Sequence, residues 1–221
     1  MLSRHTGFSL VELMVAMVAG LLLVAAVSAL FASILRANQT SMQVSRLNQE
    51  MQSIVDMMAR DLQRSGYDAG ATAFLGATSS ARSSFYFDST TDLMNETVVG
   101  SKRYQCLRVR YDDDADGCVD DPGNLSKPPA CRDPAETRVY SYSSASMGVR
   151  LDTGDSASCS GGNLLSTDNT IAISALTFEL LGSSLTTGAR TIRLSMTGNY
   201  KAAPAISLSL QRDIKLRNDG Y

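Results

Sequence analysis

Residues 4–35, RHTGFSLVELMVAMVAGLLLVAAVSALFASIL, decide the fold of this chain. A short basic leader ends at Gly7, and from Phe8 to Leu35 the residues are almost all apolar. A helix rises about 1.5 Å per residue, so a run of about 28 residues exceeds the ~30 Å hydrocarbon core of a bilayer. The stretch therefore predicts a membrane-spanning helix, and Arg4 favours a cytoplasmic N-terminus.

The unusual residue of this helix is Glu12, a carboxylic acid near the start of the apolar run. A carboxylate at the centre of a membrane helix costs roughly 2.5–3.5 kcal/mol on insertion scales, so such a residue usually has a partner. Cleavage between Gly7 and Phe8 would create a positive α-amine four residues before Glu12, and residues four apart share a helix face. The expected partner of Glu12 is the amine of this chain or of a neighbouring copy.

The segment Gly7-Phe8-Ser9-Leu10-Val11-Glu12-Leu13 resembles the class III signal of type IV pilins and pseudopilins in residue type, order and spacing. The resemblance implies cleavage after Gly7 by a prepilin peptidase, N-methylation of Phe8, and docking of Glu12 into a helical filament. An ordinary secretory signal cut after Ala29 is one alternative, which the internal acid and the length of the apolar run oppose. A plain membrane anchor, in which Glu12 has no assembly role, is the other alternative and stays open.

The segment 36–65 continues the helix without a breaker. Its apolar residues recur at steps of three and four, which predicts an amphipathic helix. These residues are Val44, Leu47, Met51, Ile54, Met58 and Leu62. A coiled coil is the alternative for so long a helix.

The helix is expected to end near Gly66, where a glycine cap would follow a basic last turn. The residues there are Arg60-Asp61-Leu62-Gln63-Arg64-Ser65-Gly66-Tyr67. This R-D-L-x-x-x-G-Y ending resembles that of PilW-type minor pilins, and J-type pseudopilins of type II secretion carry a related R-D-L segment.

The rest of the chain predicts strands, because apolar and polar residues alternate over several stretches. Strands are expected at 102–111, 137–143, 171–181, 191–197 and 205–216, with a short one at 84–87. The alternation shifts phase around Ala175, and Arg212 alone breaks the apolar face of the last strand. Consecutive strands with short turns predict an antiparallel sheet, covered on one face by the amphipathic half of the helix. The predicted fold class is α+β and pilin-like.

The cysteines predict disulfides. Cys106, Cys118, Cys131 and Cys159 all follow the membrane segment, and no two are spaced as C-x-x-C. In an exported domain an even number favours two disulfides, with three possible connectivities. Proximity in sequence favours Cys118–Cys131, which leaves Cys106–Cys159, while four free buried thiols are the alternative.

The residue inventory argues against an enzyme. The one histidine, His5, lies in the predicted leader, so the mature chain would have no imidazole for a Ser-His-Asp or Cys-His arrangement or for a zinc site. Carboxylate-only catalysis, as in glycosidases, remains open. We expect a protein that has no enzymatic activity and requires no cofactor.

An acidic loop offers a possible calcium site. The sequence Asp112-Asp113-Asp114-Ala115-Asp116-Gly117 fits D-x-D-x-D-G, the opening of an EF-hand loop, in which oxygens spaced by two converge on one cation. The twelfth position is Gly123 where an EF-hand has a bidentate glutamate, and Asp120 or Asp121 could substitute for that ligand. Asp112, Asp114 and Asp116 are the predicted Ca²⁺ ligands, and a solvated acidic turn is the alternative.

Basic residues near the C-terminus raise the question of nucleic-acid binding. They are Arg190, Arg193, Lys201, Arg212, Lys215 and Arg217. Most occupy outward positions of alternating strands and lack the interleaved aromatic residues of single-strand binders. A solvated sheet face is therefore the preferred interpretation, and no specific nucleic acid is expected.

The expected organisation is a leader at 1–7, a membrane and filament-core helix at 8–35, its amphipathic continuation at 36–66, and a β-rich head at 67–221 with an acidic, Cys-containing loop at 106–131. The resemblance implies a minor pilin that helps to start or cap a type IV pilus, with a J-type pseudopilin as the alternative. The implied partners are prepilin peptidase, other minor and major pilins, and the inner membrane, with the head on the periplasmic side before the protein reaches the cell surface.

Overall fold

The computed structural model describes residues 7, 9–70, 85–118, 128, 136–154, 156–166, 170–181 and 190–217. The chain forms two compact units, Met1–Ser45 and Arg46–Tyr221. The described elements are α1 (Leu10–Arg64), β1 (Leu93–Glu96), β2 (Arg103–Arg110), β3 (Thr137–Ser143), β4 (Gly148–Thr153), β5 (Asn163–Leu164), β6 (Ile171–Leu181), β7 (Thr191–Tyr200) and β8 (Ala203–Lys215).

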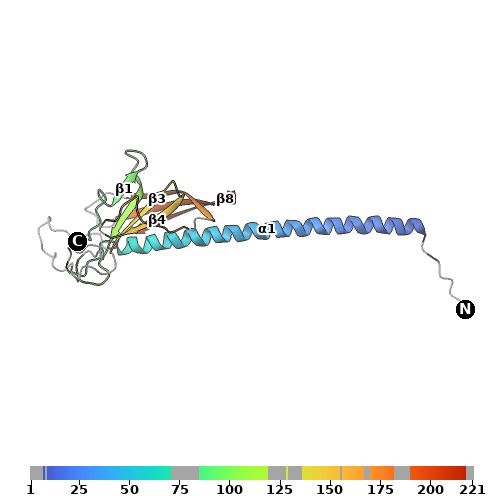
Figure 1. The fold of residues 1–221 in the computed structure, drawn as a ribbon, viewed down its shortest axis with the longest axis horizontal. Helices are drawn as coiled ribbons and strands as arrows, with labels where there is room; N and C mark the ends of the chain where they lie inside the picture. The colour runs from blue at the N-terminus through green and yellow to red at the C-terminus, as the bar shows by residue number, and fades with distance from the viewer. Residues whose placement is uncertain are drawn as a thin grey trace. The chain divides into compact units, whose positions relative to one another are not determined.

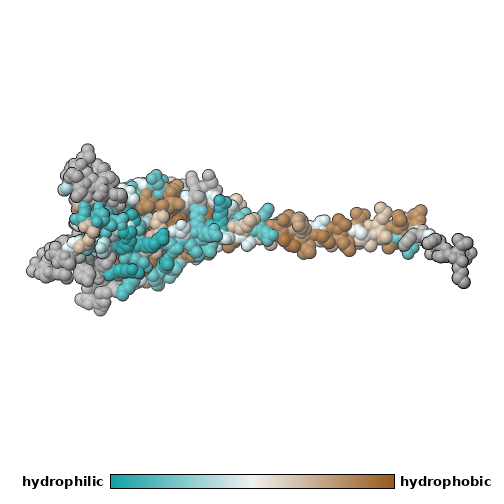
Figure 2. Space-filling view, turned by 90° about the horizontal axis from the view of Figure 1, so that it is seen from below, coloured by the Kyte–Doolittle hydropathy of each residue, from teal (hydrophilic) through white to brown (hydrophobic). Residues whose placement is uncertain are grey.

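The first unit contains the apolar turns of α1. Between Leu10 and Leu35 the large apolar side chains are 47–76% exposed, and they cover the helix on all sides. Figure 2 shows this part of the helix as mostly hydrophobic. Within the described residues, α1 is the one helix that is long and apolar enough to cross a membrane.

The second unit is an antiparallel sheet with the last turns of α1 packed against one face (Figure 1). The strand order is β5-β4-β3-β2-β6-β7-β8, and β1 pairs with β2 outside this path. This arrangement confirms the predicted α+β fold of one long N-terminal helix on an antiparallel sheet.

The sheet branches at β2. Cys106 and Leu107 each pair with both β1 and β3, whereas Tyr104 pairs with both β1 and β6. Because a strand has only two edges, β3 and β6 must share the edge of β2 that lies opposite β1. The N-terminal part of β2 thus joins the β6-β7-β8 half of the sheet, and its C-terminal part joins the β3-β4-β5 half.

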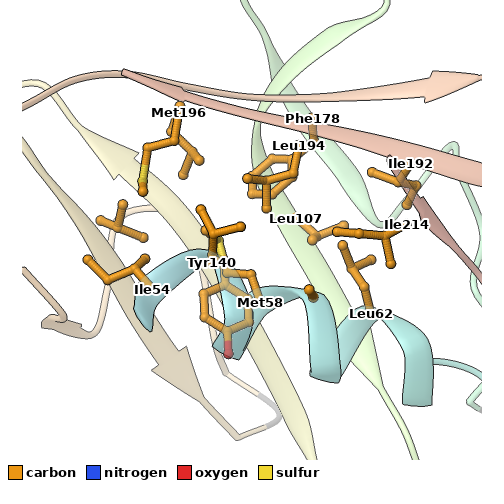
Figure 3. Close-up of a cluster of buried hydrophobic side chains, with 14 of the residues drawn as sticks. Ile54, Met58, Leu62, Leu107, Tyr140, Phe178, Ile192, Leu194, Met196 and Ile214 are labelled. Carbon is orange, nitrogen blue, oxygen red and sulfur yellow. The ribbon is translucent and has the colours of Figure 1, made fainter. Parts of the chain in front are cut away.

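The core lies between α1 and the sheet (Figure 3). Buried helix residues from Leu47 to Leu62 contact apolar residues from β2, β3, β6, β7 and β8. The predicted apolar stripe is buried except for Val44, which is 45% exposed and lies in the first unit. Gly198 permits close approach of the helix, because a Cβ at this position would lie 3.0 Å from the Met51 sulfur.

The strand predictions were largely confirmed. All five longer strands are present, and the phase shift foreseen near Ala175 is a register shift between Ile173 and Ala175 in the pairing of β6 with β7. The short strands β1, β4 and β5 were not predicted.

The predicted strand at 84–87 was wrong. Phe85 lies in a turn and residues 86–88 have no regular structure, although Phe85 and Phe87 are buried. The carbonyl oxygens of Tyr86 and Phe87 accept hydrogen bonds from the side chains of Arg110 and Arg190. Side-chain donors therefore satisfy backbone groups that a neighbouring strand would satisfy in a sheet.

Candidate functional site

The first candidate site is the N-terminal processing and assembly segment. Gly7 is exposed, whereas Phe8 lies outside the described residues. The Leu13 amide donates to the Ser9 carbonyl oxygen at 3.1 Å, and α1 begins at Leu10. Glu12 is exposed and lies in the first turn, where the helix dipole favours negative charge.

This geometry leaves the carboxylate of Glu12 accessible beside an apolar helix surface. The apolar residues near Glu12 along the helix have side chains that are 58–67% exposed. They are Val11, Met14, Val15 and Val18. A cation that reached this turn would meet one carboxylate on a largely apolar surface. The predicted cleavage after Gly7, methylation of Phe8 and pairing of Glu12 remain predictions.

The second candidate site is the end of α1, where Asp61 is the centre of a buried polar network. Its carboxylate accepts hydrogen bonds from Tyr111 at 3.1 Å, Arg138 at 2.9 Å and Tyr140 at 2.5 Å. Asp61 is 6% exposed, and both tyrosines are fully buried. Burial, with the neighbouring Asp61 carboxylate, raises the pKa of the Tyr140 hydroxyl, which therefore stays protonated and donates to Asp61.

Arg64 extends this network to the surface. Its guanidinium lies 4.2 Å from the centroid of the Tyr111 ring, a cation–π distance, and forms an ion pair with Asp113. Arg138 lies over the same ring at 4.9 Å and hydrogen-bonds the Tyr111 hydroxyl. Tyr111 is thus held by one helix residue and one strand residue at once.

The backbone after the helix pairs with the strand end that leads into the acidic loop. Gly66 has a φ of 80°, the left-handed conformation of a helix cap, and its amide donates to the Arg110 carbonyl at 2.9 Å. The Asp112 amide donates to the Tyr67 carbonyl at 2.9 Å. Three residues of the R-D-L-x-x-x-G-Y segment, Asp61, Gly66 and Tyr67, thus contact residues 110–112, and Arg64 at one of its variable positions contacts Tyr111 and Asp113.

The acidic loop brings together the three carboxylates that were predicted from the sequence. One oxygen from each of Asp112, Asp114 and Asp116 lies within 4.8 Å of the others. Asp112 is buried, and its carboxylate accepts the backbone amides of Ala69 at 3.0 Å and Ala115 at 2.7 Å. Asp114 and Asp116 are exposed and each accepts a backbone amide two residues further on.

The chemistry of this group is that of a hard-cation site formed by oxygens. Asp112 also stabilises the local structure, because its carboxylate accepts one backbone amide from the segment after α1 and one from the loop itself. Asp120, Asp121 and Gly123, which bear on completion of the site, lie outside the described residues. Calcium binding therefore stays a prediction.

The structure joins Cys106 to Cys159, the pair that was expected to remain once Cys118 and Cys131 were paired by their proximity in sequence. Cys118 is also disulfide-bonded. Its predicted partner, Cys131, lies outside the described residues.

The basic residues near the C-terminus do not form one free basic surface. Arg193 forms two hydrogen bonds with Asp213, at 2.8 and 2.9 Å, and Arg212 pairs with Asp56. Arg190 is not on an open sheet face, because it is 6% exposed and donates to the Phe87 carbonyl at 2.7 Å. Arg190, Arg193 and Arg212 thus have partners within the fold.

Sequence reasoning missed the partners of Asp61. Arg138 and Tyr140 were expected only as strand residues, and Tyr111 only as the end of a strand. The available signal was the position of Asp61 beside Met58 and Leu62, on the buried stripe of the helix, because a carboxylate on such a stripe requires partners.

Comparison with known proteins identifies the family. A model of the prokaryotic N-terminal methylation motif matches residues 2–28, which include Gly7, Phe8 and Glu12. A model of the family described as prepilin peptidase-dependent protein B matches residues 40–216, from the amphipathic half of α1 to the end of the sheet. No curated protein and no solved structure matches the chain. The chain therefore belongs to the prepilin peptidase-dependent protein B family and is a type IV pilin-like protein.

Proposed function

We propose that this protein is a minor pilin, a low-abundance subunit that helps to start or cap a type IV pilus. One observation carries the proposal: the apolar turns of α1 are exposed on all sides, and most of them lie within the match to the methylation motif at residues 2–28. A surface of this kind is stable only within a bilayer or against other apolar helices. Both environments occur when a subunit passes from the membrane into a filament.

The proposed sequence of events begins with prepilin peptidase, which cuts after Gly7 and leaves Phe8 as the new N-terminus. The apolar helix then holds the protein in the inner membrane as a single span, with the head on the periplasmic side. The new amine and Glu12 provide opposite charges at one end of the helix. Pairing of Glu12 with the amine of a neighbouring minor or major pilin would select the correct axial position during assembly, and the assembled subunit would reach the cell surface.

In this proposal the head is structural and has no catalytic role. The buried network around Asp61 fixes the end of α1 to the sheet, so that a force on the helix reaches the head through several hydrogen bonds and a packed core. The charged residues of this network serve as partners of one another.

The test is intact mass and N-terminal sequencing of the protein recovered from its native membranes. We expect a chain that begins at N-methylated Phe8. A chain that begins after Ala29, or that still begins at Met1, would contradict the proposal. A Gly7 substitution, which should block cleavage, is the matched control.

The second candidate function is that of a J-type pseudopilin in type II secretion, which the Arg60-Asp61-Leu62 segment also fits. A deletion strain separates the two functions. Loss of pili with intact secretion supports the minor pilin, and loss of secretion with intact pili supports the pseudopilin.

A further inference from the structure

A short segment between β4 and β5, residues 156–162, lies over the face of the sheet opposite α1. We call this segment the strap. Leu107 and Tyr140 point into the core between α1 and the sheet. Side chains alternate along a strand, so their neighbours Cys106 and Val139 point to the opposite face of the sheet. There Cys106 and Val139 form a small apolar cluster with Met94 and with Ala157 and Cys159 of the strap.

Apart from these contacts, the hydrogen bonds between described residues join the strap to itself, to Gly154 and to β4. The Ser158 amide donates to Asp152 at 2.9 Å, and Arg150 donates to the Ser160 carbonyl at 3.4 Å. Gly162 ends the strap with a φ of 80° and lies so close to β4 that a Cβ would be 2.2 Å from the Leu151 carbonyl oxygen. The described hydrogen bonds between nitrogen and oxygen atoms therefore fold the strap back onto β4 and Gly154. Towards β1 the strap makes a sulfur contact, in which Cys159 Sγ lies 3.8 Å from Met94 Sδ.

Noncovalent contacts stabilise the packing of the strap against the sheet only weakly. Its apolar contribution is confined to Ala157 and Cys159. On the same face, Ser141 Oγ and Arg150 Nε are buried without a hydrogen-bond partner among the described residues. These two atoms belong to directly paired residues of β3 and β4. Buried polar atoms without partners oppose burial, so the Cys106–Cys159 disulfide is the main contact that holds the strap against β2.

The two sulfurs of this disulfide differ in access. Cys106 is fully buried in β2, whereas Cys159 is only partly buried in the strap. A thiolate attacks a disulfide sulfur in line with the bond that breaks, and access decides which sulfur is attacked. Cys159 Sγ is therefore the sulfur that a thiolate from solution reaches more readily, because Cys106 is covered on the sheet.

We propose that Cys159 is a thiol–disulfide exchange site and that exchange at this residue releases the strap. A thiolate of an external thiol or dithiol attacks Cys159 Sγ and forms a mixed disulfide, while the bond to Cys106 breaks and Cys106 leaves as a thiolate that takes up a proton. A second thiolate, from the same dithiol or from another thiol molecule, then attacks the reactant's sulfur in the mixed disulfide, and Cys159 leaves as a thiolate that takes up a proton. This step leaves Cys159 reduced and the reactant oxidised to a disulfide. The released strap uncovers Met94, Cys106 and Val139.

Exchange is tested on the full-length protein in detergent, in a Cys118→Ala/Cys131→Ala background that retains only Cys106 and Cys159. Glutathione is the probe. After an acid quench, the chain is unfolded, free thiols are labelled with N-ethylmaleimide, and peptides are mapped by mass. We expect glutathione on Cys159 and the maleimide on Cys106. Glutathione on Cys106, an equal distribution, or no mixed disulfide under conditions that keep the protein folded would each overturn the proposal.

Release of the strap is tested by hydrogen exchange of the Cys106→Ala/Cys159→Ala variant. We expect amides of residues 156–162 to exchange about tenfold faster or more, as in local opening, while β6 and β7 keep their protection. Unchanged exchange in the strap would overturn the proposal. If this variant does not fold, the same comparison is made between the oxidised background protein and its glutathione adduct.

Discussion

Arg212 on β8 forms an ion pair with Asp56 on α1. The cross-strand partner of Arg212 is the buried Leu194, so Arg212 lies on the face of the sheet that α1 covers. Its side chain is 48% exposed and that of Asp56 is 55% exposed, which keeps both charges hydrated. A charge on the inner face of a terminal strand also discourages pairing with another sheet. This explains why Arg212 breaks the apolar alternation of β8.

The Arg212–Asp56 pair is expected to contribute little to stability. Exposed ion pairs stabilise by about 0.2–1 kcal/mol, and salt screens them. Single and double alanine variants of the two residues, unfolded in denaturant, should give a coupling energy in this range that falls in 1 M salt. A coupling energy above about 2 kcal/mol that salt does not change would show that the pair is desolvated.

A larger effect is expected at Asp61. In Asp61→Asn, Arg138 loses its anionic partner in a buried network, a change that typically costs about 3 kcal/mol. For a chain of this size the melting temperature should fall by about 6–12 °C. Asp56→Asn is the matched control, since it removes an exposed carboxylate from the same helix. Equal melting temperatures for the two variants would contradict the importance of the network.

The helix and the longer strands could be predicted because local patterns determine them. The stripe from Leu47 to Leu62 has helical period, and the alternation in β8 has strand period, and both patterns match the buried faces. The segment 84–87 could not be assigned correctly, because its two phenylalanines have strand spacing but its carbonyls bond to Arg110 and Arg190 from elsewhere in the chain. The branch at β2 depends on long-range pairing that no local pattern contains.

The same difference between local patterns and long-range contacts applies to the candidate sites. The methylation motif is contiguous, so residues from Gly7 to Glu12 could be recognised from the sequence, and the family model agrees. The network of Asp61 with Arg138 and Tyr140 joins residues 77 and 79 positions apart, and only the fold brings them together. Arg190 was assigned to an open face because its contact with Phe87 spans 103 positions.

Asp92 should make stability depend on pH. Burial raises the pKa of this carboxyl above its ordinary value of 3.8, although Arg110 acts in the opposite direction. Between 3.8 and the raised pKa, the folded chain binds a proton that the unfolded chain has lost. The contribution of Asp92 to stability is therefore present below this window and is lost as the pH rises through it. Denaturant unfolding between pH 3 and pH 7 should show wild type losing stability relative to Asp92→Asn.

Asp213 is the control of opposite sign for the pH experiment. The hydrogen bond from Arg193 lowers the pKa of the Asp213 carboxyl below 3.8. Its contribution is present above that value and is lost as the pH falls, so wild type should lose stability relative to Asp213→Asn only in acid. If the stability of wild type relative to the two variants changed with pH in the same direction, the raised pKa of Asp92 would be contradicted.

Glu12 is expected to act in assembly and not in processing. Glu12→Ala removes the only acid between Gly7 and Leu35 but leaves the residues around the cut unchanged. The mature mass should therefore still show cleavage after Gly7, while the amount of protein in sheared filaments falls. Glu12→Asp retains the charge and should retain part of the incorporation. Normal incorporation of Glu12→Ala would contradict the proposed pairing.

Calcium, if the prediction from the acidic loop is correct, should stabilise the head. Ligand binding to the folded state raises stability by about 2.7 kcal/mol at a hundredfold excess over the Kd. The melting temperature should therefore rise with Ca²⁺, and Asp114→Ala should abolish the rise. Asp114 is the residue of choice because Asp112 also holds the backbone of Ala69 and Ala115. Asp113 lies outside the three-carboxylate group and pairs with Arg64. Asp113→Ala should therefore lower the melting temperature measured without Ca²⁺ but keep its rise with Ca²⁺. A melting temperature that does not respond to Ca²⁺ in wild type would identify the loop as a solvated acidic turn.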